Sequence, residues 1–306
     1  MERSIYFLLA LIILATGCDQ NTYSPNGVIV DNNHATGANS LFDNSLENRI
    51  QTFVFPSNSG EVCLSSLQGV DICLNTDCFE LNGIPVTSGN ISLDYIEIFN
   101  KGSMVVTNKS TTDAGTGQML VSGGEFYLQG YLDGSPLSIA SGCPGAGELI
   151  IDASLTGGFN WNMDVWTGGV DAGGNLNWSP VIGVAFDATT GVLIEDTLTA
   201  VNWAVDPGNG DDYVLPFNWG WHNCDIFTSW PNPKTTVSVN APFEYDDTNS
   251  KVFIMYNNES TGVAYFPWDG VCGCFRSYVN SIPVGMDAHI LIIGEYSDSD
   301  YFNYAI

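Results

Sequence analysis

The sequence predicts an all-β fold, and three features of the chain support this prediction. From residue 51 onward, short apolar or alternating runs are separated by Gly, Asn, Asp and Pro, which is the punctuation typical of strands and turns. The 306 residues include 33 Gly and 13 Pro, and both residue types disrupt helix interiors. Hardly any segment combines a helical period with helix-forming residues. We therefore expect two β-sandwich-like domains.

The strand candidates divide into two regions. The first expected domain covers residues 51–147, with candidate strands at 52–55, 91–99, 103–107, 118–121 and 125–132. The second covers residues 148–306 and contains all eight Trp, with candidate strands at 149–151, 159–166, 181–187, 193–203, 235–239, 252–256, 262–266 and 288–293. A stretch rich in Gly at 141–147 marks the expected boundary.

The first residues have the pattern of an export signal. Arg3 precedes an almost unbroken apolar run at residues 5–14, which is too short to span a bilayer as an ordinary helix. The run leads into ATGC at residues 15–18, which resembles the lipobox of bacterial lipoprotein signal peptides, although a Leu-like residue usually stands where Ala15 does. The resemblance implies cleavage before Cys18 and acylation of its sulfur. The alternative is an ordinary secretory signal.

Residues 1–17 are thus the expected signal peptide, and residues 18–50 the expected flexible tether that begins at the lipidated Cys18. The tether is rich in Asn, Asp, Ser and Gly, with few large apolar residues that could form a core. Each buried CH₂ contributes about 0.8 kcal/mol, so several acyl chains would anchor the protein permanently in a lipid bilayer. The expected location is the bacterial envelope, in the outer membrane, with the periplasmic and cell-surface sides both open.

The charge of the chain limits its partners. There are 34 Asp and Glu residues against 7 Lys and Arg, which gives a formal net charge of -27. This charge repels phosphate backbones, so we expect no nucleic-acid partner. It is compatible with divalent cations, with basic ligands, or simply with solubility outside a cell.

Four short motifs carry a resemblance to known proteins. Residues 89–104 (GNISLDYIEIFNKGSM) and 120–127 (LVSGGEFY) resemble a β module that recurs in uncharacterised surface lipoproteins of Bacteroidota. Residues 220–227 (GWHNCDIF) and 282–285 (IPVG) are similar to the C-terminal module of the same proteins. Relatives more often have an apolar residue in place of His222 and a basic one in place of Ile226. The resemblance implies location and fold class, and it brings no activity and no catalytic residues.

Seven cysteines remain if Cys18 is lipidated, so at least one of them lacks an intramolecular partner. In an oxidising compartment we expect disulfides, and the cluster near the first domain offers a reasonable set of partners, whose connectivity the spacing does not determine. The candidates are Cys63, Cys73, Cys78, Cys143, Cys224, Cys272 and Cys274. For Cys224 we expect a disulfide to either Cys272 or Cys274.

Two metal sites are conceivable from the ligand types. His222 and Cys224, together with Cys272 and Cys274, form a possible four-ligand zinc set, although both spacings are shorter than in zinc ribbons. Calcium prefers hard oxygen ligands, which the loop at residues 206–212 offers. Its candidate ligands are Asp206, Asp211 and Asp212, and the simpler interpretation is a solvated turn. Residues 171–175 and 298–300 have the same two interpretations.

The Trp residues of the second region suggest either ligand binding or core packing. Trp166, Trp219 and Trp221 could present flat apolar faces on which sugar rings stack. Large aromatic residues also fill the interiors of β-sandwiches, and we expect this role for most of them.

An enzymatic function has little support in the sequence. Glycoside hydrolysis would need two carboxylates across a cleft, and the candidates are Glu97, Glu125, Asp164, Glu195 and Asp225. The chain has no Gly-x-Ser-x-Gly elbow and no nucleotide-binding glycine motif in the required context. The sequence therefore favours a non-enzymatic binding or structural module without a cofactor, whose partner is a glycan or an envelope protein. The alternatives are a carbohydrate-binding or glycan-hydrolysing lipoprotein and a calcium-stiffened adhesion module.

Overall fold

Strands dominate the structure, which confirms the predicted all-β class. The computed structural model describes residues 28–30, 38–141, 143, 146–160, 162–181, 185–187, 192–194, 212–216, 218–228, 230, 233–242, 245–259, 261–295 and 301–305. Among these residues, no helix is both long and apolar enough to cross a membrane.

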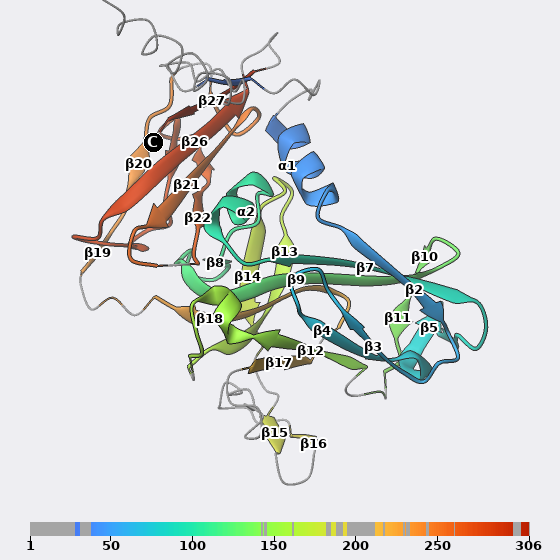
Figure 1. The fold of residues 1–306 in the computed structure, drawn as a ribbon. Coiled ribbons are helices and arrows are strands. Elements are labelled where there is room, and N and C mark those ends of the chain that lie inside the picture. The colour runs from blue at the N-terminus through green and yellow to red at the C-terminus, as the bar shows by residue number, and fades with distance from the viewer. Residues whose placement is uncertain are drawn as a thin grey trace, which may run out of the picture.

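The main sheet lies at the centre of the molecule (Figure 1). Its strand order is β2-β7-β9-β18-β13-β14-β8, with the short β10 paired to β9. Neighbours are antiparallel except for β14 and β8, which are parallel. The strands are β2 (Gln51–Pro56), β7 (Asn90–Ile98), β8 (Thr112–Asp113), β9 (Leu120–Leu132), β10 (Ser135–Pro136), β13 (Asp164–Val170), β14 (Leu176–Pro180) and β18 (Gly220–Phe227).

A covering sheet packs against one face of the main sheet. Its order is β17-β12-β4-β3, with β3 (Glu61–Ser65), β4 (Asp71–Asn75), β12 (Gly147–Asp152) and β17 (Asp212–Pro216). Apolar side chains alternate along these strands, so Ile72, Leu149 and Leu215 point inward and meet Leu93 and Phe126 of the main sheet in the first core. The first core therefore lies between these two sheets.

The chain ends in a C-terminal sheet with the order β1-β27-β26-β21-β22. Its strands are β1 (Val28–Val30), β21 (Ser250–Tyr256), β22 (Ala264–Phe266), β26 (Ala288–Glu295) and β27 (Tyr301–Ala305). Helix α1 (Ala38–Glu47) lies beside β26 and helix α2 (Lys101–Val106), between this sheet and the main sheet (Figure 1).

Short elements complete the described part of the fold. They are the 3₁₀ turns η1 (Thr76–Cys78) and η2 (Ala153–Thr156), and the strands β5 (Phe79–Leu81), β6 (Ile84–Pro85), β11 (Ser138–Ile139), β15 (Ala185–Asp187), β16 (Val192–Ile194), β19 (Lys234–Thr235), β20 (Ser238–Val239), β23 (Trp268–Asp269), β24 (Cys274–Arg276) and β25 (Ile282–Pro283). Small sheets join β11-β5-β6, β15-β16, β19-β25 and β20-β24-β23.

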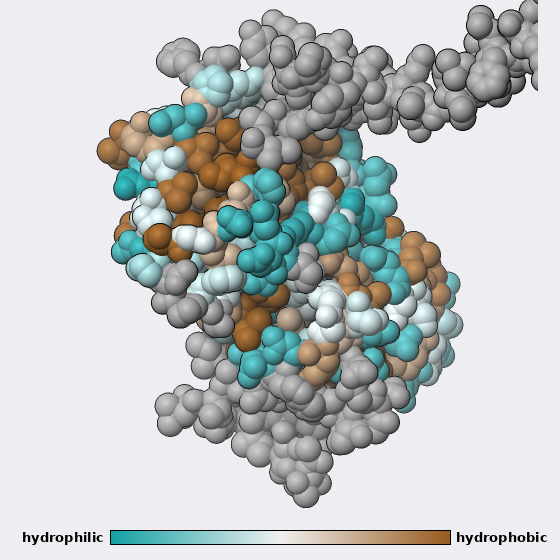
Figure 2. All heavy atoms as spheres, turned by 60° about the vertical axis from the view of Figure 1, so that its left-hand side comes forward, coloured by the Kyte–Doolittle hydropathy of each residue, from teal (hydrophilic) through white to brown (hydrophobic). Residues whose placement is uncertain are grey.

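Two further cores hold the C-terminal sheet in place. The alternation along β21 sends Phe253 to the second core, where it meets Trp166 and Trp221 on the other face of the main sheet. The same alternation sends Ile254 to the third core, where it meets Phe275 of β24. Turned to bring this sheet forward, the molecule shows hydrophobic residues gathered in the upper part of the view (Figure 2).

The sheets do not divide where the sequence suggested. Strand β12, which follows the boundary expected at residue 147, pairs with β4, which precedes it. Strand β18, which also follows this boundary, pairs with β9, which precedes it. Strands from both predicted domains therefore share the main sheet and the covering sheet, because hydrogen-bonded pairing joins segments that are distant along the chain.

The predicted tether is wrong where the structure describes it. Residues 28–30 pair with β27, and residues 38–47 form α1. Phe42 of this helix is buried, and its ring meets that of Phe253 edge to face with 6.4 Å between centroids. A few apolar residues are thus enough to pack α1 against the rest of the protein, although the segment predicted as a tether is mostly polar. The predicted signal peptide and Cys18 lie outside the described residues.

The strand predicted at residues 103–107 is also wrong, because residues 103–106 belong to α2 and Thr107 is the C-cap of this helix. The side chain of Asn100 caps the helix by accepting a hydrogen bond from the backbone N–H of Ser103 at 2.9 Å. Met104 and Val105 face the second core. The cap and this burial override the strand preference of the β-branched residues.

Candidate functional site

Cysteine pairing agrees in part with the prediction from the sequence. Cys63 is bonded to Cys73, and Cys78 is bonded to Cys143, so the four clustered cysteines pair among themselves as expected. Cys63 and Cys73 stand directly opposite each other on β3 and β4. Cys78 and Cys143 join η1 to the segment that follows β11.

The expected disulfide of Cys224 is wrong. Cys272 is bonded to Cys274, and Cys224 forms no disulfide with any cysteine of the described residues. Cys224 points from β18 into the first core, far from solvent. Burial raises the pKa of its thiol well above the usual value, and Asp225 and Asp164 raise it further, which favours the protonated thiol over the reactive thiolate.

The predicted zinc set does not form, because its last two ligands are bonded to each other. His222 is also engaged elsewhere, since its Nε2 lies 2.7 Å from the carbonyl oxygen of Asn218. Burial lowers the pKa of His222 to about 4, against the opposing effect of this contact, so the ring is neutral at physiological pH.

The predicted calcium ligands are only partly described. Asp206 and Asp211, like residues 298–300, lie outside the described residues. Asp212 begins β17 and pairs across the sheet with Asp152. Within the described part of the chain, no group of three or more His, Cys, Asp or Glu side chains is arranged to hold a metal ion.

The stretch at residues 171–175, which begins with Asp171, is an ordinary hairpin turn between β13 and β14. The Oδ1 atom of Asp171 accepts hydrogen bonds from the backbone N–H groups of Gly173 at 2.9 Å and Asn175 at 3.0 Å. Its Oδ2 accepts from the side-chain amide of Asn175 at 3.0 Å. Donors of the turn itself therefore occupy both oxygens of the Asp171 carboxylate.

The burial of two Trp rings contradicts their predicted stacking role. Trp166 is 1% exposed and Trp221 is 7% exposed, so protein covers the faces of both rings. Trp219 is partly buried, with its ring 5.0 Å from that of Phe79. Trp166 and Trp221 therefore fill the interior, as we expected for most of the Trp residues.

Two of the predicted carboxylates do come together, inside the protein. Glu125 on β9 and Asp225 on β18 lie on neighbouring strands, on the face of the main sheet that meets the second core. The amide of Asn223 donates to Oδ2 of Asp225 at 2.7 Å, and its oxygen accepts from the hydroxyl of Ser122 at 2.8 Å. Thr261 then donates to the carbonyl oxygen of Ser122 at 2.5 Å. This chain of hydrogen bonds joins the main sheet to the segment before β22.

Burial determines the protonation of this pair. It raises the pKa of Glu125 well above the usual value, and Asp225 raises it further, whereas Lys109 and the indole of Trp178 act in the opposite direction. The indole N–H of Trp178 donates a hydrogen bond to the carbonyl oxygen of Ser110 at 2.8 Å. Burial also raises the pKa of Asp225.

The pair is closed to substrates in this structure. Both Glu125 and Asp225 are 0% exposed. The ammonium group of Lys109 lies 5.9 Å from the centroid of the Trp221 ring and donates to the carbonyl oxygen of Gly174 at 3.3 Å. Paired carboxylates beside Trp rings are present as a glycosidase would need, but without an open groove.

An open site lies instead at the junction of α1, β2 and α2. This cleft of about 220 Å³ is formed by the end of α1, the turn between β3 and β4, and the link between β7 and α2. Its lining is mostly polar and consists of Asn48, Arg49, Ile50, Gln51, Leu67, Gln68, Glu97, Phe99, Asn100 and Ser103.

Glu97 organises the wall of this cleft. Its Oε1 accepts hydrogen bonds from the side-chain amide of Gln51 at 2.9 Å and from the backbone N–H of Gln68 at 3.0 Å. Its Oε2 accepts from the hydroxyls of Ser66 at 2.7 Å and Tyr95 at 3.2 Å. Four donors thus occupy a side chain that is 4% exposed, which fixes it as a positioning group rather than a free base.

Arg49 supplies the positive charge of the cleft. Its guanidinium donates from Nη1 to the carbonyl oxygen of Ser45 at 2.6 Å and from Nη2 to the hydroxyl of Ser103 at 3.1 Å. A guanidinium has five N–H groups, so donors remain for a ligand. Two apolar side chains border the cleft, since Ile50 is 41% exposed and Leu67 is 88% exposed.

Sequence reasoning found Glu97 but missed Arg49, because Arg49 lies in the segment interpreted as a tether. The available signal was an isolated basic residue shortly before the first predicted strand of a very acidic chain. No family model, curated protein or solved structure matches this chain.

Proposed function

We propose that this protein is an exported lipoprotein of the bacterial envelope, held at the outer membrane by acylated Cys18, which acts as a non-enzymatic binding module. The disulfides support export, because such bonds persist in oxidising compartments. The export pattern and ATGC motif at residues 1–18 support the anchor. The partner on the membrane side is the lipid bilayer.

The cleft around Arg49 carries the proposal of a binding function. It is open, it offers unused donors, and it is bordered by exposed apolar side chains, which together suit a small polar ligand with an apolar face. The interior carboxylates are 0% exposed and lie on other strands, which argues for binding without hydrolysis.

A carbohydrate ligand is the specific candidate that this lining favours. Hydroxyl groups of a sugar accept hydrogen bonds from guanidinium and amide donors such as Arg49 and Gln68, while the C–H face of a sugar ring packs on side chains such as Leu67. An envelope protein is the other class of partner expected from the sequence.

The lipid anchor is tested by mass spectrometry and cell fractionation of the native protein. We expect an N-terminus at an acylated Cys18 and recovery in the membrane fraction, whereas Cys18→Ser should release the protein, because its hydrophobic anchor is lost. An intact Met1, or an unmodified Cys18 thiol in the mature product, would contradict the anchor.

The binding site is tested by screening the full-length protein against a glycan array, followed by calorimetry with any glycan bound. We expect Arg49→Ala to weaken binding by about tenfold or more, because a charge-assisted hydrogen bond is lost. Arg276→Ala is the matched control, since Arg276 is also partly exposed but lies outside the cleft. Absence of binding to every glycan, or equal losses in both variants, would reject the carbohydrate site.

A further inference from the structure

The hairpin of β23 and β24 contains a disulfide from which we expect only a small contribution to the stability of the fold. Cys272 and Cys274 are separated by a single residue, so their bond closes the smallest loop among the disulfides of the described residues. A disulfide stabilises a fold mainly by restricting the unfolded chain, and this effect falls as the closed loop shortens. Stability alone therefore gives a weak reason for this bond.

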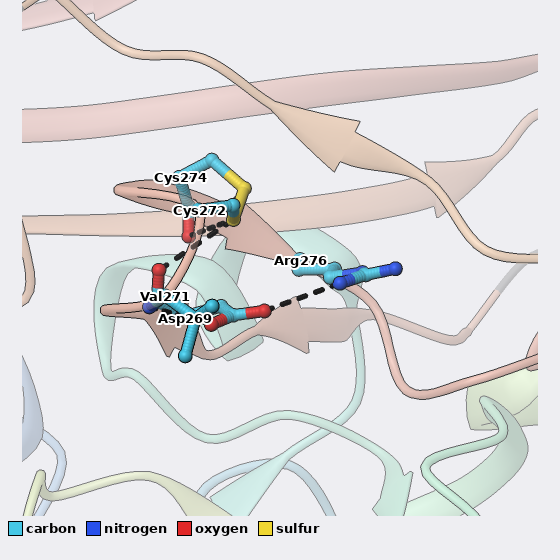
Figure 3. Close-up of a disulfide and its surroundings, with 5 residues drawn as sticks. All are labelled: Asp269, Val271, Cys272, Cys274 and Arg276. Carbon is cyan, nitrogen blue, oxygen red and sulfur yellow. Dashed lines mark hydrogen bonds and ion pairs between the residues drawn. A yellow bond between two sulfur atoms is a disulfide. The ribbon is translucent and has the colours of Figure 1, made fainter.

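The hairpin loop is already held by Asp269 (Figure 3). The carbonyl oxygen of Asp269 accepts from the backbone N–H of Gly273 at 2.9 Å, and its Oδ1 accepts from the N–H of Val271 at 2.9 Å. Its Oδ2 forms an ion pair with Arg276 at 3.2 Å. Gly273 adopts φ 61°, the left-handed conformation that the turn requires.

The base of the hairpin is fixed in the third core. Phe275 is 1% exposed, and its ring meets that of Trp268 edge to face with 5.0 Å between centroids. Phe275 also pairs with Val239 of β20. Cys272 Sγ lies 3.5 Å from the carbonyl oxygen of Asp269, but the other contacts of Asp269 and those of Phe275 do not involve sulfur. These contacts can therefore hold the hairpin without the disulfide.

The two sulfur atoms are unequal in access. Cys272 is exposed, whereas Cys274 is 2% exposed. Val271, beside the exposed cysteine, is 99% exposed and offers an apolar contact at the same point of the surface. An incoming thiolate therefore reaches Cys272, and Cys274 stays close by as the group that leaves and later returns.

We propose that Cys272–Cys274 is a thiol–disulfide exchange site that oxidises a dithiol of another protein. A thiolate of the partner attacks Sγ of Cys272, which forms a mixed disulfide and breaks the bond to Cys274, and Cys274 leaves as a thiolate that takes a proton from solvent. The second thiolate of the partner then attacks the partner sulfur of the mixed disulfide and releases Cys272. The partner loses two electrons and two protons, and the Cys272–Cys274 pair gains them.

The first test uses the oxidised full-length protein with dithiothreitol as the dithiol. Samples are quenched with N-ethylmaleimide, and each cysteine is followed by mass spectrometry while circular dichroism reports the fold. We expect Cys272 and Cys274 to open at about tenfold lower dithiothreitol than Cys63 and Cys73, with the fold unchanged, and to close again in glutathione disulfide. Cys63 is exposed as well, so it controls for access. Opening together with Cys63–Cys73, or loss of the fold on opening, would overturn the proposal.

The second test separates the roles of the two cysteines by single substitution. In Cys274→Ser, the remaining Cys272 should react with glutathione disulfide and stay glutathionylated, because no resolving thiol is present. In Cys272→Ser, the buried Cys274 should react with glutathione disulfide at a rate lower by about tenfold or more. Equal rates in the two variants would refute the assignment of Cys272 as the attacked sulfur.

Discussion

At the scale of single residues, burial decides which side chains can act on a ligand. Glu97 and Glu125 are both buried acids, but Glu97 accepts four hydrogen bonds at the edge of a cleft, whereas Glu125 lies in the second core beside Asp225. The sequence could nominate both carboxylates, because any acid in a strand is a candidate. It could not separate their roles, since the difference lies in what the fold packs around each one.

The raised pKa of Glu125 makes the stability of the protein depend on pH. The folded state keeps the proton at pH values where the unfolded state, with its ordinary pKa near 4.5, has released it. The contribution of this group to the free energy of unfolding is therefore complete below pH 4.5 and falls as the pH rises through the raised folded pKa.

Replacing Glu125 by Gln should remove this decrease in the free energy of unfolding at high pH, because Gln does not ionise. We expect Glu125→Gln to raise the free energy of unfolding at pH 8 by about 1 kcal/mol or more relative to the parent, and to change it little near pH 4. Urea unfolding across this pH range measures the effect. Glu148→Gln, on an exposed side chain of β12, is the control for the loss of one carboxylate, and its effect at pH 8 should be smaller than that of Glu125→Gln. Identical profiles for Glu125→Gln and the parent would contradict the assignment.

At the scale of elements, long-range pairing and caps explain the differences between prediction and structure. The runs at residues 118–121 and 125–132 are predicted as two strands, but Gly123 and Gly124 form an irregularity within a single strand, where the register with β18 shifts, and β9 extends over Leu120–Leu132. At Gly124, φ is 122° and an added Cβ would lie 2.8 Å from the ring of Phe99. Glycine here marks close packing rather than a turn, and a single sequence does not separate these two uses.

The disulfides should differ in their effect on stability according to the loops that they close. Cys78–Cys143 joins residues 65 apart, and Cys272–Cys274 joins residues 2 apart. The loop-closure relation gives about 4 kcal/mol for the first bond and about 1.5 kcal/mol for the second. Urea unfolding of the paired Cys→Ser variants measures both, and a loss from Cys272/Cys274→Ser that equals or exceeds that from Cys78/Cys143→Ser would contradict the relation for this fold.

At the scale of the whole molecule, the sequence predicted the class of fold better than its organisation. Alternating runs such as residues 91–99 identify strands, and these formed because one face of each strand could be buried. The sequence did not show that β4 pairs with β12, which links distant segments. For the same reason it could not predict the cleft, whose lining comes from residues 48–51, 67–68 and 97–103.

Net charge gives the last prediction at this scale. Folding brings a formal net charge of -27 into a compact volume, so repulsion between carboxylates opposes it. Added salt screens that repulsion, with a Debye length that falls from about 30 Å at 0.01 M to about 10 Å at 0.1 M. Salt would also weaken attractive ion pairs, but among the described residues the one between Arg276 and Asp269 is the only salt bridge. Repulsion is thus the larger of the two screened terms.

We therefore expect the midpoint of thermal unfolding to rise by several degrees between about 0.01 M and 0.3 M NaCl at neutral pH, with most of the rise below about 0.1 M. Potassium chloride should give the same curve, because screening depends on ionic strength and not on the identity of the cation. Calcium chloride at matched ionic strength distinguishes screening from binding, since a specific calcium site would raise the midpoint further in proportion to the logarithm of the free calcium concentration. A midpoint that falls or stays constant with sodium chloride would show that attraction between charges, rather than repulsion, dominates the folded state.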